Sequence, residues 1–246
     1  MRLARIATDS GPRPVCLRDG RWHEVADPYA DTLTFTGPAH DLDGARLLAP
    51  AEPRVLLGMA HNGAPGDRDL PLQAFMKSTR TVIGPEDPIV VDEGLGQVNV
   101  EGELAVVVRR TCRRLRPEDV PSAILGYTIG NDVTAVEQTA LDDKLTQAKH
   151  GDGFTPLGPW IETDLDPGDV PIAVHVNGVT VAEASTRQLA WNVSEQLVHL
   201  TRYLTLGPGD VVLTGCPFTF SPVKPGDRAE ITLGGIGTLS NPVRAL

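Results

Sequence analysis

The chain has little cysteine, no long hydrophobic run and no excess of positive charge. Its 246 residues include three cysteines, Cys16, Cys112 and Cys216, which are far apart and lack the spacing of a metal site. This pattern argues against a disulfide framework and favours a reducing, cytoplasmic compartment. No apolar run approaches the roughly 18–20 residues that span a bilayer, and residues 1–5 lack the apolar core of a signal peptide. We therefore expect no membrane partner.

Acidic residues outnumber basic ones, 32 against 22, which gives a formal net charge of −10. A charge of this sign argues against nucleic acid as a partner. An anionic substrate would then need local positive charge, which a bound metal ion together with Lys77 and Lys149 could supply. With 41% hydrophobic and 22% charged residues, the composition is that of a globular protein with a sizeable core.

The predicted elements are mostly short strands, which favours a β-dominated α+β fold. Residues 1–50 are predicted to form a small β-rich N-terminal domain, with a connector over 28–50, and residues 51–246 the main domain. Asp19-Gly20 between two apolar runs is a hairpin signal. Strands of the main domain are expected at 54–58 and 89–91.

Helices are predicted at two places. A short one over 117–124 starts with a proline, and a longer one over 192–204 has Asn192 and Glu195 as its capping pair. Pro-Gly-Asp tripeptides before β-rich runs are predicted to be turns, at 167–169, 208–210 and 225–227.

The most informative segment is an apolar, β-branched run at 100–108 that begins with two glutamates. Residues i and i+2 of a strand point to the same face, so Glu101 and Glu103 are predicted to point side by side into one pocket. Two buried carboxylates at that separation need a cation or a proton between them. The alternative is an ordinary strand whose exposed face carries two glutamates.

A third carboxylate lies near the end of a second predicted strand, residues 125–134. Asp132 could complete a three-carboxylate site, and an all-oxygen site favours Mg²⁺, Mn²⁺ or Ca²⁺ over zinc. The alternative for Asp132 is a loop residue that hydrogen-bonds its own backbone. The sequence alone does not bring the two strands together.

Five segments then point to a known family by their order and spacing: 101–107, 126–134, 149–159, 209–217 and 235–241. Together they resemble segments of the fumarylacetoacetate hydrolase superfamily, from about residue 53 to the C-terminus. The branch that they resemble most contains 2-hydroxyhepta-2,4-diene-1,7-dioate isomerases and 5-oxopent-3-ene-1,2,5-tricarboxylate decarboxylases. The resemblance implies a mixed β-roll core, Mg²⁺ or Mn²⁺ bound by Glu101, Glu103 and Asp132, and a homodimer.

The resemblance also implies roles for residues around the metal. Lys149 resembles the family's active-site lysine, which would bind a developing oxyanion or move a proton, and Asp152 would orient Lys149 or its loop. The implied substrate-side residues are Lys77, Thr155, Thr214, Gly215 and Cys216. Structural alternatives stay open for them: a solvated lysine, a turn residue, or a small packing residue in the case of Cys216.

The family's water-activating histidine and glutamate are absent in register. Counted from Gly58, their positions hold Ala64 and Asp67. His61 is a candidate replacement, but a base must reach its proton within about 3 Å, and a displacement of three residues moves a side chain by several ångströms, which argues against it. Three other positions differ from the residues that the family usually has. Val136-Glu137 stands in place of Arg-Asp, and Cys216 and Gly153 each stand in place of a threonine.

A 2-keto or 2-hydroxy-enol acid can chelate a metal ion that stabilises an enolate. Decarboxylation needs only this electron sink, isomerisation also needs a proton shuttle, and C–C hydrolysis needs an activated water. We therefore predict a metal-dependent isomerase or decarboxylase of a small anionic keto or enol (di)acid. One alternative is a hydrolase of acylpyruvates or fumarylpyruvate-like 1,3-diketones with His61 or His150 as base. Another is a repurposed or non-catalytic member in a biosynthetic pathway.

Overall fold

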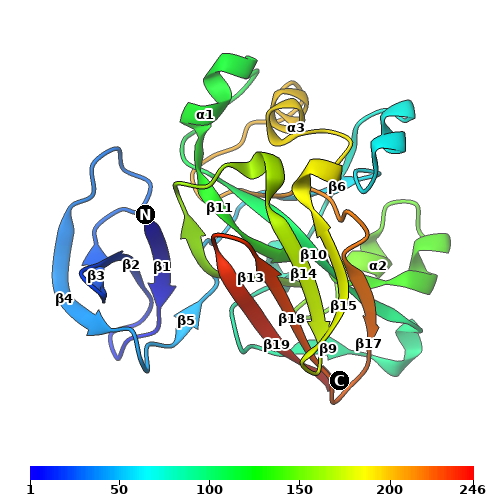
Figure 1. Ribbon diagram of the computed structural model, residues 1–246, viewed down its shortest axis with the longest axis horizontal. Helices are drawn as coiled ribbons and strands as arrows, with labels where there is room; N and C mark the ends of the chain where they lie inside the picture. The colour runs from blue at the N-terminus through cyan, green and yellow to red at the C-terminus, as the bar shows by residue number, and fades with distance from the viewer.

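The computed structural model describes residues 1–246 and consists mainly of two β-sheets (Figure 1). The larger sheet has 14 strands, and its main path runs β4-β3-β2-β1-β13-β11-β10-β16-β6-β7. Its strands are β1 (Arg2–Ile6), β2 (Arg13–Arg18), β3 (Arg21–Val25), β4 (Phe35–Asp41), β5 (Leu47–Leu48), β6 (Leu56–Ala60), β7 (Gln73–Met76), β8 (Val82–Ile83), β10 (Val98–Val108), β11 (Ile124–Asn131), β12 (Thr134–Ala135), β13 (Thr155–Glu162), β16 (Val211–Leu213) and β17 (Phe220–Val223).

The smaller sheet has five strands in the order β15-β14-β18-β19-β9. They are β9 (Ile89–Val91), β14 (Pro171–Val176), β15 (Val179–Ser185), β18 (Arg228–Leu233) and β19 (Gly237–Ala245). Both sheets mix orientations, because β16 pairs with β6 and β19 pairs with β9 in parallel while most neighbours are antiparallel. The predicted β-dominated, mixed fold is confirmed.

Helices are few and short. The α-helices are α1 (Val120–Ala123), α2 (Thr146–Lys149) and α3 (Val193–Leu200), and the 3-10 helices are η1 (Pro65–Asp69), η2 (Thr79–Thr81), η3 (Glu93–Leu95), η4 (Pro117–Asp119), η5 (Val136–Ala140), η6 (Pro167–Asp169) and η7 (Thr186–Gln188). None is long and apolar enough to cross a membrane. The predicted capping pair is present, since Asn192 and Glu195 each accept the other's backbone N–H, at 3.0 and 2.9 Å. Helix α3 ends at Leu200, four residues before the predicted end.

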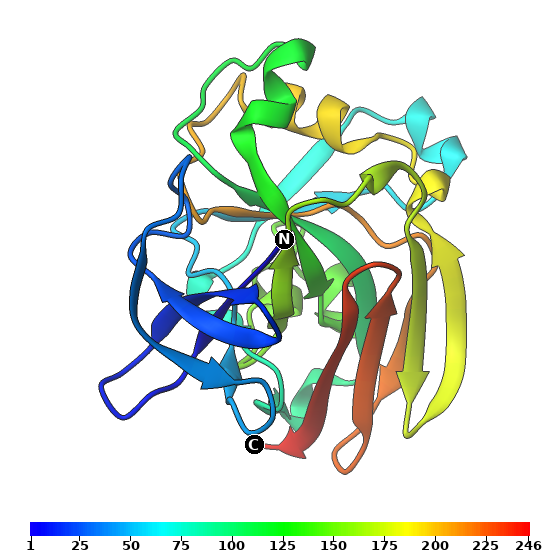
Figure 2. The same cartoon turned by 60° about the vertical axis from the view of Figure 1, so that its left-hand side comes forward.

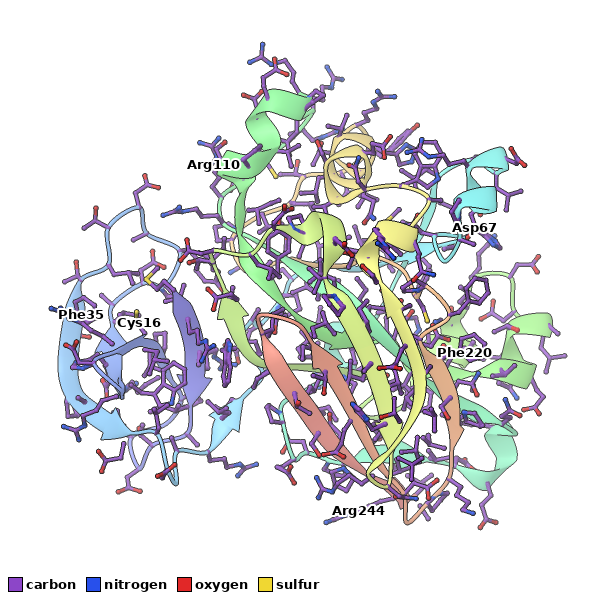
Figure 3. The ribbon with its side chains drawn as sticks, in the orientation of Figure 1. Cys16, Phe35, Asp67, Arg110, Phe220 and Arg244 are labelled. Carbon is purple, nitrogen blue, oxygen red and sulfur yellow. The ribbon has the colours of Figure 1, made fainter.

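The N-terminal strands lie at one side of the molecule (Figures 1 and 2). The predicted hairpin joins β2 to β3, and its two turn residues, Asp19 and Gly20, have φ of 51° and 73°, as a two-residue turn of this kind requires. The predicted connector over 28–50 is wrong, because it contains β4 and β5. Strand β4 carries no apolar alternation because it is an outer strand with Phe35 exposed (Figure 3). Residues 1–50 share the larger sheet with the rest through the β1–β13 pairing.

Strand β10 organises the main body. Its even-numbered side chains, such as Leu104 and Val106, are buried in the largest hydrophobic cluster, which also contains residues of β14 and β18. A Cβ on Gly102 would lie 2.9 Å from Val174 and 3.0 Å from Ile231, so the second sheet packs directly on the backbone of β10 at this point. The odd-numbered face of β10 carries Glu101 and Glu103.

Candidate active site

The register of two antiparallel strands brings the three predicted carboxylates together. Gly102 pairs with Asn131 and Glu103 with Gly130, so Asp132, directly after β11, lies opposite Glu101, whose carbonyl accepts the Asp132 N–H at 3.0 Å. One carboxylate oxygen from each of Glu101, Glu103 and Asp132 lies within 4.8 Å of the others. The predicted convergence of the three side chains is therefore present.

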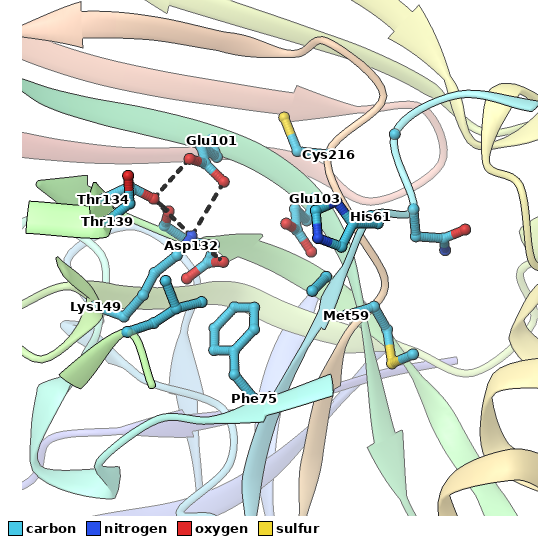
Figure 4. Close-up of a pocket in the computed structure, with 14 residues that line it drawn as sticks. Met59, His61, Phe75, Glu101, Glu103, Asp132, Thr134, Thr139, Lys149 and Cys216 are labelled. Carbon is cyan, nitrogen blue, oxygen red and sulfur yellow. Dashed lines mark hydrogen bonds and ion pairs between the residues drawn. The ribbon is translucent and has the colours of Figure 1, made fainter. Parts of the chain in front are cut away.

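The three carboxylates line a cavity of about 330 Å³ (Figure 4). Met59 and Phe75 form its apolar wall, and His61 and Cys216 also line it. Gly58 makes room for this wall, because a Cβ there would lie 2.3 Å from the Phe75 ring. The cavity thus combines a charged cluster with an apolar side, as sites for small polar ligands do.

Lys149, the last residue of α2, is buried beside the carboxylates. Its Nζ donates to Asp132 Oδ2 and to Thr134 Oγ1, both at 2.6 Å, and lies 3.4 Å from Glu101 Oε2 (Figure 4). It also lies 5.1 Å from the centre of the Phe75 ring. Burial alone would lower the pKa of Lys149, but the negative charges of Asp132 and Glu101 outweigh burial and raise it. Lys149 is therefore held as an ammonium ion.

Lys77 lies behind Asp132 rather than in the cavity. Its side chain is fully buried and donates to Asp132 Oδ1 and, at 2.8 Å, to the Phe154 carbonyl. Burial lowers the pKa of Lys77 although the charge of Asp132 opposes it. Burial would raise the pKa of Asp132, but Lys149 and Lys77 together lower it. Lys77 therefore fixes Asp132 and does not line the cavity.

Glu103 is the least compensated charge of the cluster. It is 2% exposed, and its one hydrogen bond comes from the Gly215 N–H to Oε2 at 2.7 Å. Burial, with the charges of Asp132 and Glu101, raises the pKa of Glu103 well above its usual value. Burial likewise raises the pKa of Glu101, although Lys149 opposes the shift.

The donor set fits a divalent cation. Three ionised carboxylates and two ammonium groups carry a formal charge of −1, and a buried net charge of this kind needs a counter-ion. The oxygens are hard ligands of the type that Mg²⁺ and Mn²⁺ prefer. A divalent ion would change the sum to +1, which suits an anionic ligand. The site would then supply the local positive charge that an anionic substrate needs in a chain with a net charge of −10.

The turn after β16 supports the cluster through its backbone. Thr214 is fully buried, and its hydroxyl donates to the Leu104 carbonyl at 2.8 Å, so it does not reach the cavity. Gly215 has φ of 107°, and a Cβ there would lie 2.7 Å from the Asn62 carbonyl, so the position requires glycine. Burial, with the nearby Glu101 and Glu103, raises the pKa of the Cys216 thiol. Cys216 is thus a neutral residue of the cavity wall.

Two further predicted residues lie outside the cavity. Thr155 is buried, and its hydroxyl is hydrogen-bonded to the Thr81 hydroxyl at 2.7 Å. Asp152 is exposed, its carbonyl accepts the Val90 N–H at 3.0 Å, and its carboxylate does not contact Lys149. The orientation of Lys149 that we expected from Asp152 comes instead from Asp132 and Thr134, because the lysine loop turns its aspartate toward solvent.

His61 lies at the rim of the cavity. Strand β6 ends at Ala60, and His61 adopts φ of 51° directly after it, so the chain turns there and His61 lines the cavity despite its displacement in sequence. His61 makes no hydrogen bond or ion pair. His150, the other candidate base, is bonded to the Met76 carbonyl at 3.0 Å and does not line the cavity.

Sequence reasoning missed three residues of the site. Thr134 donates to Glu101 Oε1 at 2.6 Å and accepts from Lys149, and its place two residues after Asp132 was the available signal. Phe75 lies in β7, two residues before the expected Lys77. Asn62, which binds the turn that holds Glu103, gives no signal in the sequence.

Comparison with known proteins identifies the family. Residues 48–244 match the model described as fumarylacetoacetate (FAA) hydrolase C-terminal, and residues 1–50 match one described as Rv2993c-like, N-terminal. The chain belongs to the fumarylacetoacetate hydrolase family, as its five motifs predict.

Several relatives align over nearly the whole chain. Protein Rv2993c of Mycobacterium tuberculosis is 38% identical over 262 residues, which cover 99% of this chain and 98% of that protein. The solved structure of 5-carboxymethyl-2-hydroxymuconate delta-isomerase from Mycobacterium smegmatis has a TM-score of 0.94 at 39% identity, with both chains fully covered. That of 2-hydroxyhepta-2,4-diene-1,7-dioate isomerase from Mycobacterium marinum has a TM-score of 0.94 at 37% identity, covering 100% of this chain and 98% of the other.

A more distant family structure contains a metal ion. Maleylpyruvate hydrolase from Sphingobium sp. SYK-6, in complex with manganese(II) and pyruvate, has a TM-score of 0.81 at 25% identity and covers 100% of this chain and 99% of that chain. Family members therefore include isomerases and hydrolases, and at least one binds a divalent metal together with a keto acid.

Proposed function

We propose that this chain is a divalent-metal-dependent enzyme that isomerises or decarboxylates a small keto or enol diacid. The observation that carries the proposal is the convergence of Glu101, Glu103 and Asp132 within 4.8 Å in one cavity. The isomerases from Mycobacterium smegmatis and Mycobacterium marinum, which align over the whole chain, support the reaction class.

Glu101, Glu103 and Asp132 would hold Mg²⁺ or Mn²⁺. When bound, the metal supplies Lewis-acid stabilisation of an enolate. Lys77 and Thr134 hold the carboxylates in place from behind and from the side, so the ligand set is preorganised.

Lys149 would bind the negative oxygen that develops on the substrate. It is held as an ammonium ion by Asp132 and Glu101, so it acts as a donor rather than as a base. A fixed positive donor at such an oxygen contributes more in a partly buried site than in water. The apolar wall formed by Met59 and Phe75 would pack against the substrate's carbon chain.

His61 would shuttle the proton that isomerisation requires. His61 lies at the rim of the cavity, and its ring has no hydrogen-bond partner in the protein (Figure 4). The ring would therefore be free to contact a substrate carbon that extends from the carboxylate cluster toward solvent. In ketonisation of a 2-hydroxy-diene acid, the hydroxyl proton would pass to solvent water and protonated His61 would give one proton to a chain carbon, to be reprotonated from solvent afterwards.

A C–C hydrolase of acylpyruvates is the second candidate, because His61 lines the cavity. A hydrolase needs a base beside water, and His61 is in the cavity although the family's histidine–glutamate pair is absent in register. Asp67, at the glutamate position, accepts the Gly63 and Ala64 N–H groups at 2.8 and 3.1 Å, so it is committed to the turn. Without a partner to orient it, His61 is better placed to move a proton than to direct a water.

The test is product analysis by NMR in D₂O with Mg²⁺. A 2-hydroxy-dienedioate, oxaloacetate and an acylpyruvate are each incubated with the protein, with the protein plus chelator, and with Glu103→Gln. Metal-dependent deuterium incorporation or CO₂ loss, without cleavage of the acylpyruvate, is the expected result. Cleavage of the acylpyruvate would establish the hydrolase instead. Turnover that survives chelator and Glu103→Gln would exclude a metal-centred reaction, and no turnover of any substrate would favour a repurposed member.

A further inference from the structure

A buried asparagine links the segment that carries His61 to the turn that holds Glu103. Asn62 is 2% exposed and follows His61 in the chain. Its Nδ2 donates to the Thr214 carbonyl at 2.6 Å and to the Trp191 carbonyl at 3.1 Å, and its Oδ1 accepts the Trp191 N–H at 2.7 Å. One amide thus joins the rim segment (residues 61–69), the turn after β16 and Trp191, the residue before the cap of α3.

The turn that Asn62 binds is the one that holds Glu103. The Thr214 carbonyl and the Gly215 N–H belong to the same peptide unit, and that N–H is the single hydrogen bond to Glu103. Because a peptide is planar, a donor that fixes its carbonyl also fixes the direction of its N–H. Asn62 therefore sets the orientation of the group that orients Glu103.

Two neighbouring residues allow the effect on the turn after β16 to be tested apart from the effect on the rim segment. Gln196 also donates to the Thr214 carbonyl, at 3.2 Å, and to the Trp191 carbonyl, at 2.8 Å, but it belongs to α3 and not to the rim segment. Arg68 fastens the rim segment to α3: it forms two 2.9 Å bonds to the Glu195 carboxylate and lies 4.5 Å from the Trp191 ring centre. Arg68 makes no hydrogen bond to the turn after β16, and Gln196 makes none to the rim segment.

We propose that Asn62 is a positioning residue that sets Glu103 for metal binding and His61 for proton transfer at the same time. This rests on the proposed function, and its metal-binding part can be tested without turnover. The Gly215 N–H is the one hydrogen bond to Glu103, and His61 directly precedes Asn62 in the chain. Loss of Asn62 therefore removes a donor from the peptide that orients Glu103 and loosens the segment that carries His61.

The experiment measures the Mn²⁺ dissociation constant, kcat and KM for the wild type, Asn62→Ala, Arg68→Ala and Gln196→Leu. Loss of a residue that orients a metal ligand costs roughly 10- to 100-fold in metal affinity. Asn62→Ala should weaken Mn²⁺ binding by that factor and lower kcat at saturating Mn²⁺. Arg68→Ala should lower turnover while leaving the Mn²⁺ dissociation constant within about twofold, and Gln196→Leu should weaken Mn²⁺ binding alone.

Asn241→Ala is the matched control for simple destabilisation. Asn241 is also buried and also donates to two backbone carbonyls, those of Gly84 and Asp87, at 2.9 Å each, but it does not line the cavity. It should lower the melting temperature as Asn62→Ala does without changing Mn²⁺ affinity.

Unchanged Mn²⁺ affinity in Asn62→Ala, with wild-type binding intact, would overturn this inference and leave the proposed function standing. Equal losses in Asn62→Ala and Asn241→Ala would also overturn it. Failure of the wild type to bind Mn²⁺ would instead refute the metal site itself.

Discussion

Glu103→Gln is expected to make the metal-free protein more stable while destroying its metal site. In the metal-free fold, the Glu103 carboxylate is buried, has one hydrogen bond and faces two like charges, which raises its pKa well above the usual value. Glutamine keeps an oxygen that can accept the Gly215 N–H and removes the charge. An unsatisfied buried polar group costs about 1–3 kcal/mol, more if charged, so the gain should be at least of this order at pH 8.

The assay is thermal unfolding with and without Mg²⁺. For a chain of this length, each kcal/mol shifts the melting temperature by about 2–4 °C, so metal-free Glu103→Gln should melt a few degrees above the wild type. With Mg²⁺ at 100 times its dissociation constant, the wild type should gain about 2.7 kcal/mol and the variant nothing. When the metal is added, the melting temperature of the wild type should therefore rise by about 5–11 °C relative to that of Glu103→Gln.

The pH dependence has a defined sign. Because the pKa of Glu103 is higher in the folded than in the unfolded chain, its protonated form stabilises the fold fully below the unfolded value, near 4.5, and this contribution is lost as pH rises through the folded pKa. The advantage of metal-free Glu103→Gln should thus shrink as the pH falls from 8 toward 5.

Two other variants serve as controls for this prediction. Glu101→Gln should gain less, because Glu101 is already paired with Lys149 and Thr134, and exposed Glu183→Gln should not change stability. A metal-free Glu103→Gln protein that melts below the wild type at pH 8, or that still gains stability from Mg²⁺, would refute the reasoning.

The remaining predictions concern charge, packing, catalysis and assembly. Lys77→Met should destabilise the protein by about 3–5 kcal/mol in thermal unfolding because it leaves Asp132 with one buried partner fewer; an unchanged melting temperature would contradict this. Lys149→Met should lower kcat by roughly 10²–10³-fold, and a change confined to KM would argue against oxyanion binding. His61→Ala should slow isomerisation far more than decarboxylation in NMR assays, and equal effects would exclude His61 as the shuttle. Gly102→Val should destabilise the fold, because its methyl groups would meet Val174; normal stability would show that the sheets can separate. The predicted homodimer should give about twice 26.3 kDa by light scattering, and a single-chain mass would refute it.

The sequence predicted the features that depend on local periodicity. The two-residue alternation of β10 placed Glu101 and Glu103 on one face, and the capping pair placed the start of α3. The hairpin at Asp19-Gly20 followed from its turn residues. These features depend on neighbours within a few positions, so a single sequence contains them.

Features that depend on distant contacts could not be predicted in the same way. The pairing of Glu101 with Asp132 depends on the register between β10 and β11, which the core sets. The sequence does not show how Lys77 and Lys149 differ in position. In the structure, Lys77 lies behind Asp132 and Lys149 lines the cavity. The place of Asn62 depends on where α3 packs against the turn after β16, and nothing near residue 62 encodes that contact.

The central claim is that Glu101, Glu103 and Asp132 form a divalent metal centre. It is tested most directly by crystals grown with Mn²⁺, with an anomalous difference map collected near the manganese absorption edge. The account predicts one strong peak within about 2–2.5 Å of an oxygen from each of the three carboxylates. A map without a peak among them, in crystals where Mn²⁺ is present in excess, would contradict the account.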